Sequence, residues 1–232
     1  MPASDNLIRV ARALAPIREQ RFVFAGASIL PLLLDDPAAP PPRFTVDVDA
    51  AVNVLTYSQW ERLQSRLREC GVVVRGNPAV GKGRICLFHL DEIEVDIMPV
   101  RLQLILPPSR MLELGFQFAE PHQLADDLEI LALSAPGLLA AKLEAFGDRG
   151  AHDPAISKDL DDIVALLDRR LGVGAEVSGA PAEMRHFIAV VMTRLLGDGH
   201  VRDVISDLLR DRERERRAVE LMRTLSSISP LS

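Results

Sequence analysis

The sequence predicts an α+β fold: a mixed β-sheet core flanked by helices over residues 1–133, followed by a helical C-terminal half over residues 134–232. The first observation is that segments alternating apolar and polar residues, as half-buried strands do, end before residue 134. The second is that apolar residues after this point recur with the spacing of helices. A group of strands followed by a group of helices is typical of an α+β protein.

The N-terminal elements are predicted to be a helix, a strand and a second helix. Residues 4–19 carry a helical stripe of apolar side chains, and Phe22–Phe24 is a short strand that ends before Gly26. A short helix is expected from Ala27 to Leu34. The segment Pro37–Pro42 contains four prolines, which exclude a regular element, so we expect a stiff surface loop there.

The most informative strand is predicted at residues 45–54. Four valines and one alanine alternate there with a more polar set, which comprises Thr45, Asp47, Asp49, Ala51 and Asn53. Strand periodicity predicts that every valine faces the core and that both aspartates lie on the opposite face. A helix capped by Ser58 is expected to follow and to end near Cys70.

The remaining strands are predicted in three places. Val72–Val74 and Ile85–Leu90 form a hairpin around a glycine-rich turn, and Ile93–Met98 alternates so that Asp96 points away from the core. An extended piece is expected at Leu128–Leu133. The C-terminal half is predicted to contain helices at about 134–149, 157–171, 181–196 and 199–224, with Gly172–Gly179 as a linker.

Composition narrows the possible functions. The chain has 232 residues and a net charge of −6 at pH 7, which argues against extensive binding of nucleic-acid phosphates. The mixed-charge segment Arg210–Arg217 is a candidate basic patch, but we expect a solvated helix face held by i,i+4 charge pairs. There is no membrane-length apolar run or signal peptide, and Cys70 and Cys86 are expected to stay reduced. We therefore expect a cytoplasmic protein.

Three aspartates on strands indicate metal chemistry. An Asp-x-Asp pair on one strand places two carboxylates on one face about 7 Å apart. Magnesium fits Asp47 and Asp49, because it takes oxygen ligands and shares its shell with substrate phosphates. Asp96, on a second strand, would complete a two-metal clamp. The alternative is that all three simply face water, but aspartate is so poor a strand former that the metal interpretation is favoured.

Two further groups are candidates for binding phosphates. The turn Gly26-Ala27-Ser28 opens a helix, so its backbone N–H groups and the Ser28 hydroxyl suit a triphosphate; a plain turn is the alternative. Lys142 lies on a later helix and would hold phosphates as a point charge, and Asp159 would orient it or contact the nucleotide. Without further support, Lys142 would be a solvated lysine, and Lys158 and Asp162 would form an ordinary i,i+4 pair.

The order of these motifs resembles the polymerase-β-like nucleotidyltransferases. The motifs are Gly26-Ala27-Ser28, then Arg43-Phe44-Thr45-Val46-Asp47-Val48-Asp49, and then Asp96 on a distant strand. More narrowly, Lys142 within Leu138–Ala145 and the later Lys158-Asp159-Leu160-Asp161-Asp162 are similar to motifs of the AbiEii/MenT nucleotidyltransferase toxins. The resemblance implies Mg²⁺ at Asp47 and Asp49, to which strand placement adds Asp96. It also implies catalytic roles for Asp47, Asp49, Asp96, Lys142 and Asp159, and nucleotide contacts from Gly26, Ala27, Ser28, Arg43, Thr45 and Lys142.

The resemblance also implies a function. The protein would bind a nucleoside triphosphate such as ATP and pass its NMP to an acceptor, the tRNA 3′ end, as the toxin of a toxin–antitoxin pair with a cognate antitoxin. Two alternatives are an enzyme that modifies a small molecule such as an antibiotic, which the acidic net charge favours, and a non-catalytic nucleotide-binding module of the same fold.

Overall fold

The computed structural model describes residues 5–36, 42–74, 86–102 and 109–228. The chain forms two compact units. The first comprises Met1–Leu32 and Phe44–Leu133, and the second comprises Leu33–Arg43 and Ser134–Ser232. The sequence-based division falls at residue 133 alone, whereas the structure groups Leu33–Arg43 with the later helices.

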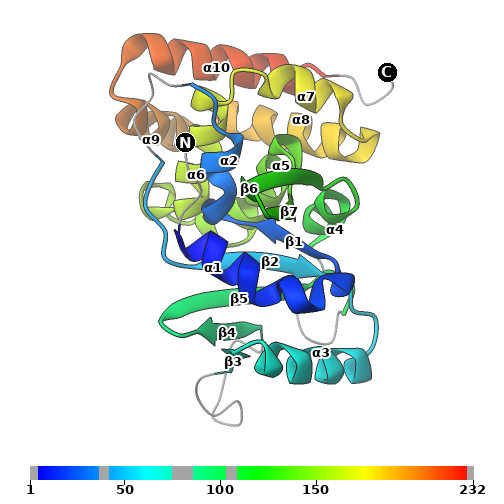
Figure 1. The fold of residues 1–232 in the computed structure, drawn as a ribbon. Helices are drawn as coiled ribbons and strands as arrows, with labels where there is room; N and C mark the ends of the chain where they lie inside the picture. The colour runs from blue at the N-terminus through cyan, green and yellow to red at the C-terminus, as the bar shows by residue number, and fades with distance from the viewer. Residues whose placement is uncertain (1–4, 37–41, 75–85, 103–108, 229–232) are drawn as a thin grey trace. The chain divides into compact units, whose positions relative to one another are not determined.

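The first unit is built on a mixed sheet, which confirms the predicted α+β class (Figure 1). Within the described residues it has seven strands in the order β3-β4-β5-β2-β1-β7-β6. β1 pairs with β7, and β2 with β5, in parallel, and the other neighbours are antiparallel. The strands are β1 (Phe22–Ala25), β2 (Val48–Val52), β3 (Val72–Val73), β4 (Leu87–Leu90), β5 (Ile93–Pro99), β6 (Glu120–Ala125) and β7 (Leu128–Ala132).

Helices accompany this sheet. α1 packs against β2 and β7 through its apolar stripe, as its sequence period predicts. The short α2 follows a 3₁₀ turn at Ala27–Ile29, in agreement with the predicted short helix. α4 and β6 were not predicted, because neither has a long periodic pattern. The helices are α1 (Asp5–Leu14), α2 (Leu30–Leu33), α3 (Tyr57–Glu69) and α4 (Arg110–Gln117).

β2 is shorter than predicted, and the alternation of its faces is incomplete. Val46 precedes the strand and is 56% exposed, so the expectation that every valine faces the core is wrong there. Ala50, Ala51 and Val52 are all fully buried, so both faces of the sheet are covered at this end of the strand. A period-two rule assumes one open face, and it fails where both faces are covered.

The start of α3 corrects the predicted cap. Thr56, not Ser58, is the N-cap: its hydroxyl accepts from Gln59 N at 3.2 Å, and the Gln59 side chain accepts from Thr56 N at 3.1 Å. This reciprocal pair is a capping box. β3 and β4 pair as the predicted hairpin, and the glycine-rich turn between them lies outside the described residues, as does most of the predicted Pro37–Pro42 loop.

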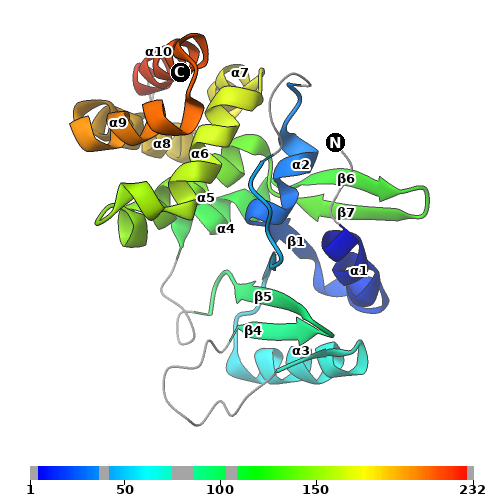
Figure 2. The same ribbon diagram turned by 90° about the vertical axis from the view of Figure 1, so that its left-hand side faces the viewer.

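The second unit is helical, as predicted, with two differences. Gly172–Gly179 is mostly helix α7 instead of a linker. The predicted helix over 199–224 is two helices, because Arg210 adopts a left-handed conformation (φ 49°) and Asp211 caps a new helix. Figure 2 shows these helices from another side. They are α5 (Ala135–Ala145), α6 (Lys158–Arg169), α7 (Val173–Gly179), α8 (Ala182–Gly197), α9 (Gly199–Leu209) and α10 (Arg212–Ser226).

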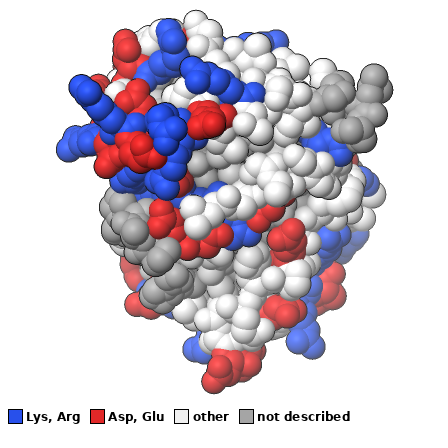
Figure 3. All heavy atoms as spheres, turned by 90° about the horizontal axis from the view of Figure 1, so that it is seen from above, with Lys and Arg blue, Asp and Glu red and all other residues white. Residues whose placement is uncertain are grey.

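Several charged side chains of α10 form ion pairs within the protein. Basic and acidic side chains lie intermixed on the face shown in Figure 3. Arg216 pairs with Glu213 at 2.6 Å and with Glu220 at 3.9 Å, as expected of a charge-paired helix face. Arg214 departs from that expectation, because it bonds the buried Asp168 of α6. Among the described residues, no helix is both long and apolar enough to cross a membrane.

Candidate active site

Asp49 and Asp96 are direct neighbours across two parallel strands. The register of β2 and β5 pairs Asp49 with Asp96 and Val48 with Val95. Residues paired in this way point to the same face, and the strands are about 4.8 Å apart. Val48 and Val95 are fully buried, so the two half-buried aspartates occupy the other face together.

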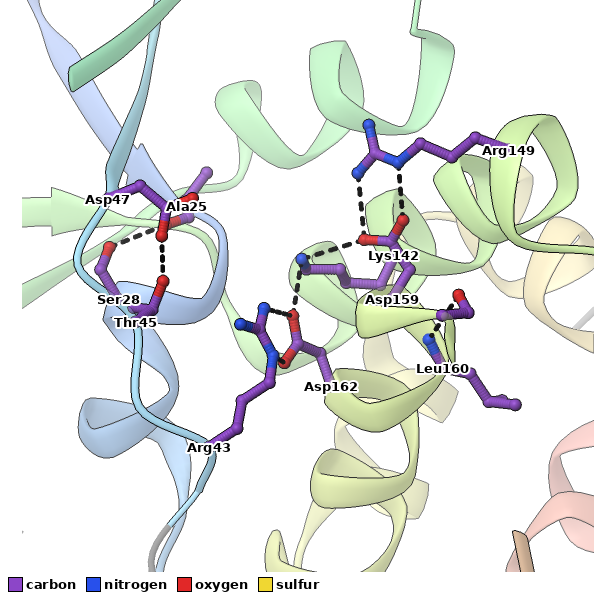
Figure 4. A network of polar contacts seen from close by, with 11 residues as sticks. Ala25, Ser28, Arg43, Thr45, Asp47, Lys142, Arg149, Asp159, Leu160 and Asp162 are labelled. Atoms are coloured by element: carbon purple, nitrogen blue, oxygen red, sulfur yellow. Dashed lines mark hydrogen bonds and ion pairs between the residues drawn. The ribbon is translucent and has the colours of Figure 1, made fainter. Parts of the chain in front are cut away.

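Asp47 lies just before β2 and is held locally. Its carboxylate accepts a hydrogen bond from the Thr45 hydroxyl, as Figure 4 shows. Asn6 of α1 donates to the carbonyl of the intervening Val46 at 3.0 Å. This anchors the chain entering the strand. Thr45, a predicted nucleotide contact, thus serves Asp47 in this structure.

Gly26 makes the turn after β1 possible and leaves room for Asp49. Its φ of 68° lies in the region that glycine favours. A Cβ built on Gly26 would stand 1.8 Å from Asp49 Oδ2 and 2.7 Å from its Cγ. Ala25, the preceding residue, pairs with Asp49 across β1 and β2. No residue with a side chain fits here unless the carboxylate moves.

The two residues after Gly26 are buried. Ala27 is 6% exposed, and Ser28 is 2% exposed and donates its hydroxyl to the Ala25 carbonyl at 3.2 Å (Figure 4). The Ser28 side chain therefore closes its own turn. Any contact of this turn with a phosphate would therefore have to come from backbone N–H groups instead of this hydroxyl.

The donor chemistry of the first unit fits magnesium in part. Carboxylate oxygens on one face of the sheet are the ligands that Mg²⁺ prefers, and Asp49 and Asp96 supply them side by side. Over the described ranges, no three Asp, Glu, His or Cys side chains stand close enough to hold a metal ion. Asp49 and Asp96 therefore fit as a pair, and the convergence of Asp47 on them stays a prediction.

Cys86 is a neighbour of Asp96 that the sequence did not indicate. Its thiol is buried, and burial, assisted by the negative charge of Asp96, raises its pKa to about 12. Its carbonyl accepts from Ile97 N at 2.9 Å, which extends the pairing of β4 and β5. The side chain beside Asp96 is thus a neutral thiol at physiological pH.

The second unit contains a chain of five alternating charges, here called the charge ladder: Arg43, Asp162, Lys142, Asp159 and Arg149 (Figure 4). Arg43 donates to both oxygens of Asp162 at 2.8 and 2.9 Å. Arg149 likewise donates to both oxygens of Asp159, at 2.8 and 3.1 Å. The Lys142 ammonium lies between the carboxylates, 2.7 Å from Asp162 Oδ2 and 3.1 Å from Asp159 Oδ1.

Local geometry brings the ladder together. After α5 the chain makes a π-helical turn, Phe146–Gly150, and Ser157 then caps α6 by accepting from Leu160 N at 3.3 Å. A Cβ on Gly150 would lie 2.4 Å from Ser157 Oγ. Because residue 150 has no side chain, the start of α6 packs directly on this turn. Arg149 and Asp159 therefore meet.

Burial makes the ladder electrostatically strong. The side chains of Asp162, Asp159 and Lys142 are 1%, 6% and 12% exposed. Burial acts to raise the pKa of Asp159, but the Arg149 hydrogen bond and the charges of Lys142 and Arg149 outweigh it, so the pKa lies below its usual value. Arg149 remains 71% exposed at one end.

The predicted contact of Asp159 with Lys142 is present, and the ladder adds residues that we did not assign. The sequence allowed an ordinary i,i+4 pair between Lys158 and Asp162. In the structure, Asp162 pairs instead with Lys142 and Arg43. Arg149 holds Asp159. The signal was in the sequence: Asp159 and Asp162 are one helical turn apart, and so share a face.

Paired aspartates beside a glycine turn are the kind of site that a nucleotidyltransferase needs. Comparison with known families shows that the chain is of this class and identifies its family. The model described as "Nucleotidyl transferase AbiEii toxin, Type IV TA system" matches residues 10–226, so the chain belongs to this family. It is therefore a nucleotidyltransferase of a toxin–antitoxin system, as the sequence motifs predicted.

The solved structures that the comparison found are distant in sequence. An antigenic nucleotidyltransferase-like protein from Paracoccidioides brasiliensis is 16% identical, covers 94% of each chain, and has a TM-score of 0.49. The enzyme ANT(2")-Ia, in complex with adenylyl-2"-tobramycin, is 13% identical over 81% of this chain and 96% of its own, with a TM-score of 0.47. A search of curated proteins found no match.

Proposed function

We propose that this protein transfers an NMP from a nucleoside triphosphate, such as ATP, to the 3′ end of tRNA in a magnesium-dependent reaction. The observation that carries the proposal is the register of β2 and β5, which sets Asp49 beside Asp96 on one face next to Gly26. Bound Mg²⁺ would neutralise charge on the phosphates. The residues proposed to hold it are Asp47, Asp49 and Asp96.

Each of the two units carries residues that we propose as candidate phosphate ligands. In the first unit, Gly26, Ala27 and Ser28 offer backbone N–H groups, and Thr45 fixes Asp47. In the second unit, Lys142 offers a positive charge that Asp159 orients. The resemblance also implies that Arg43 contacts the nucleotide, whereas its ion pair with Asp162 points to a different role.

In the proposed reaction, an acceptor hydroxyl oxygen bonds to the α-phosphorus of the triphosphate. The bond from this phosphorus to the bridging oxygen breaks, so that pyrophosphate leaves, and the hydroxyl proton passes to water. Such catalysis depends mainly on positioning and charge neutralisation, which rigid, buried charged groups supply without reorganising. The buried aspartates of the charge ladder are held by two hydrogen bonds from each arginine. This preorganisation supports a catalytic role for Lys142 and Asp159.

The acceptor and the partner are proposed from family membership. A family of toxins in type IV toxin–antitoxin systems implies an antitoxin partner and an NTP substrate. Modification of tRNA in the cytoplasm would block translation and so account for toxicity. The second candidate is a small hydroxyl-bearing antibiotic as acceptor, which the net charge of −6 favours over a polyanion.

The direct test is incubation of the purified protein with each labelled NTP, Mg²⁺ and total tRNA, followed by separation of the RNA. We expect label on tRNA with the wild-type protein and none with Asp49→Asn. Arg216→Gln is the control, because this exposed arginine pairs with Glu213 and Glu220 on its own helix, α10. Label on an aminoglycoside but not on tRNA would support the second candidate, and absence of transfer to either would refute both.

A further inference from the structure

Asp162 holds two cations at once, although its side chain is only 1% exposed. Arg43 bonds both of its oxygens, and Lys142 Nζ lies 2.7 Å from one of them. A buried carboxylate loses several kcal/mol of solvation, which these cations offset. The arrangement of charges around Asp162 therefore determines where the Lys142 ammonium stands.

The ladder is symmetric about Lys142. Each aspartate accepts hydrogen bonds on both oxygens from one arginine, and one oxygen of each aspartate also lies next to the lysine ammonium. If Arg43 were removed, the carboxylate of Asp162 would lose its two-pronged donor. It would then draw the ammonium towards itself and away from Asp159. Arg43 thus sets the position of Lys142 by competing for Asp162.

The backbone that carries Arg43 is anchored on α6 a second time. At the other end of Leu33–Arg43, the N–H groups of Asp35 and Asp36 both donate to the Arg169 carbonyl at 3.1 Å. Arg170 donates to the Leu33 carbonyl at 3.1 Å and to Asp35 at 3.0 Å. Both ends of the segment are therefore tied to one helix, with Arg43 at the end that meets Asp162.

We propose that Arg43 is a positioning residue that acts through Asp162 on Lys142, and that it is not a ligand of the nucleotide. The inference rests on the proposed function for its effect on transfer, but its geometry lies wholly in the second unit. An arginine whose fork already matches a carboxylate in two parallel bonds is used for orientation. Lys142 is the group that then acts on the phosphates.

Lysine reactivity tests this without any need for turnover. The chain has three lysines, Lys82, Lys142 and Lys158, so acylation by a small amine reagent can be followed at each by mass spectrometry. Lys158 is exposed and serves as the internal reference. Arg43→Gln should slow acylation of Lys142 about threefold or more, because Asp162 then binds the ammonium without competition from Arg43, and Asp162→Asn should speed it by a similar factor.

The double variant decides between the two roles. If Arg43 acts through Asp162, Arg43→Gln/Asp162→Asn should match Asp162→Asn alone, because the carboxylate that transmits the effect is gone. Arg43→Lys should recover part of the wild-type rate. Independent, multiplying effects of the two substitutions, or no effect of Arg43→Gln in a protein with a normal melt, would overturn the proposal.

Transfer kinetics provide the second readout. A positioning residue should lower kcat about tenfold or more with little change in the KM for NTP, whereas a direct phosphate ligand should raise KM. Arg216→Gln again serves as the charge-matched control. If the wild-type protein transfers nothing, the proposed function fails while the acylation result still decides the role of Arg43. A raised KM with unchanged kcat in Arg43→Gln would assign Arg43 to the nucleotide.

Discussion

Gly26 lies directly against the carboxylate of Asp49, so closely that a Cβ at residue 26 would stand 1.8 Å from Asp49 Oδ2. The conformation of the turn that ends β1 and the position of the aspartate that faces it from β2 therefore depend on each other. This contact also explains why the glycine and the Asp-x-Asp pair occur together although about twenty residues separate them.

Gly26→Ala should therefore damage both the fold and the site. The substitution forces a side chain into a left-handed backbone (φ 68°) and displaces the Asp49 carboxylate. We expect a loss of about 1–3 kcal/mol in the free energy of unfolding, with transfer abolished. Denaturant titration and the tRNA-labelling assay measure the two effects. Gly197→Ala is the control, since a Cβ there meets nothing within 4 Å; equal effects of both variants would contradict the argument.

Asp49→Asn tests whether the neighbouring carboxylates serve function at the expense of stability. Asp49 and Asp96 point to one face from adjacent strands, and like charges so placed repel. In metal-free buffer, the melting temperature of Asp49→Asn should equal or exceed that of the wild-type protein, while transfer should be lost. Addition of Mg²⁺ should then raise the melting temperature of the wild-type protein more than that of the variant. A large drop in metal-free melting temperature would show that Asp49 is structural.

The sequence predicted the elements that carry strong patterns and missed what depends on tertiary contacts. The Asp-x-Asp strand, the hairpin and the helical half follow from periodicity, which is a local property. The exposure of Val46 and the burial of Ala51 depend on what covers each face of the sheet. The α7 helix follows a glycine and includes two more, so propensity favoured a linker, which packing through Val173 and Val177 overrides.

For the candidate site too, single residues were predictable from the sequence, whereas contacts between distant segments were not. Single residues such as Lys142 and Asp159 stand out by motif, and their contact was expected. The bidentate pair of Arg43 with Asp162 joins residues 119 positions apart, and no spacing rule reaches that far. Even so, the one-turn spacing of the two aspartates indicated that both carboxylates lie on one face of the helix.

Acid should weaken the charge ladder through Asp159. The pKa of this group is lower in the folded protein than its ordinary value of 3.8, so the folded state binds its proton less readily than the unfolded state does. The stabilisation is then fully present above pH 3.8 and is lost as the pH falls through the lower, folded pKa. The Asp159→Asn variant has no carboxyl group at this position and so cannot take up a proton there. The difference in unfolding free energy between wild type and variant should stay constant above about pH 4 and shrink as the pH falls further. A constant difference in this lower range would rule out the ion pairs as its source.

The proposed role of the second unit in nucleotide transfer depends on Lys142. Its ammonium is held between two buried carboxylates, an arrangement that fixes a positive charge in place. If this charge serves the triphosphate, Lys142→Ala should reduce transfer about a hundredfold or more, as removal of a charge-stabilising donor commonly does. Lys142→Arg should restore it only in part, because a planar fork cannot occupy the place of a compact ammonium between Asp159 and Asp162. A thermal melt of each variant controls for misfolding, since Lys142→Ala removes a cation that lies between two buried carboxylates. Near-normal transfer by a folded Lys142→Ala protein would remove the lysine from the reaction and leave the ladder as a purely structural network.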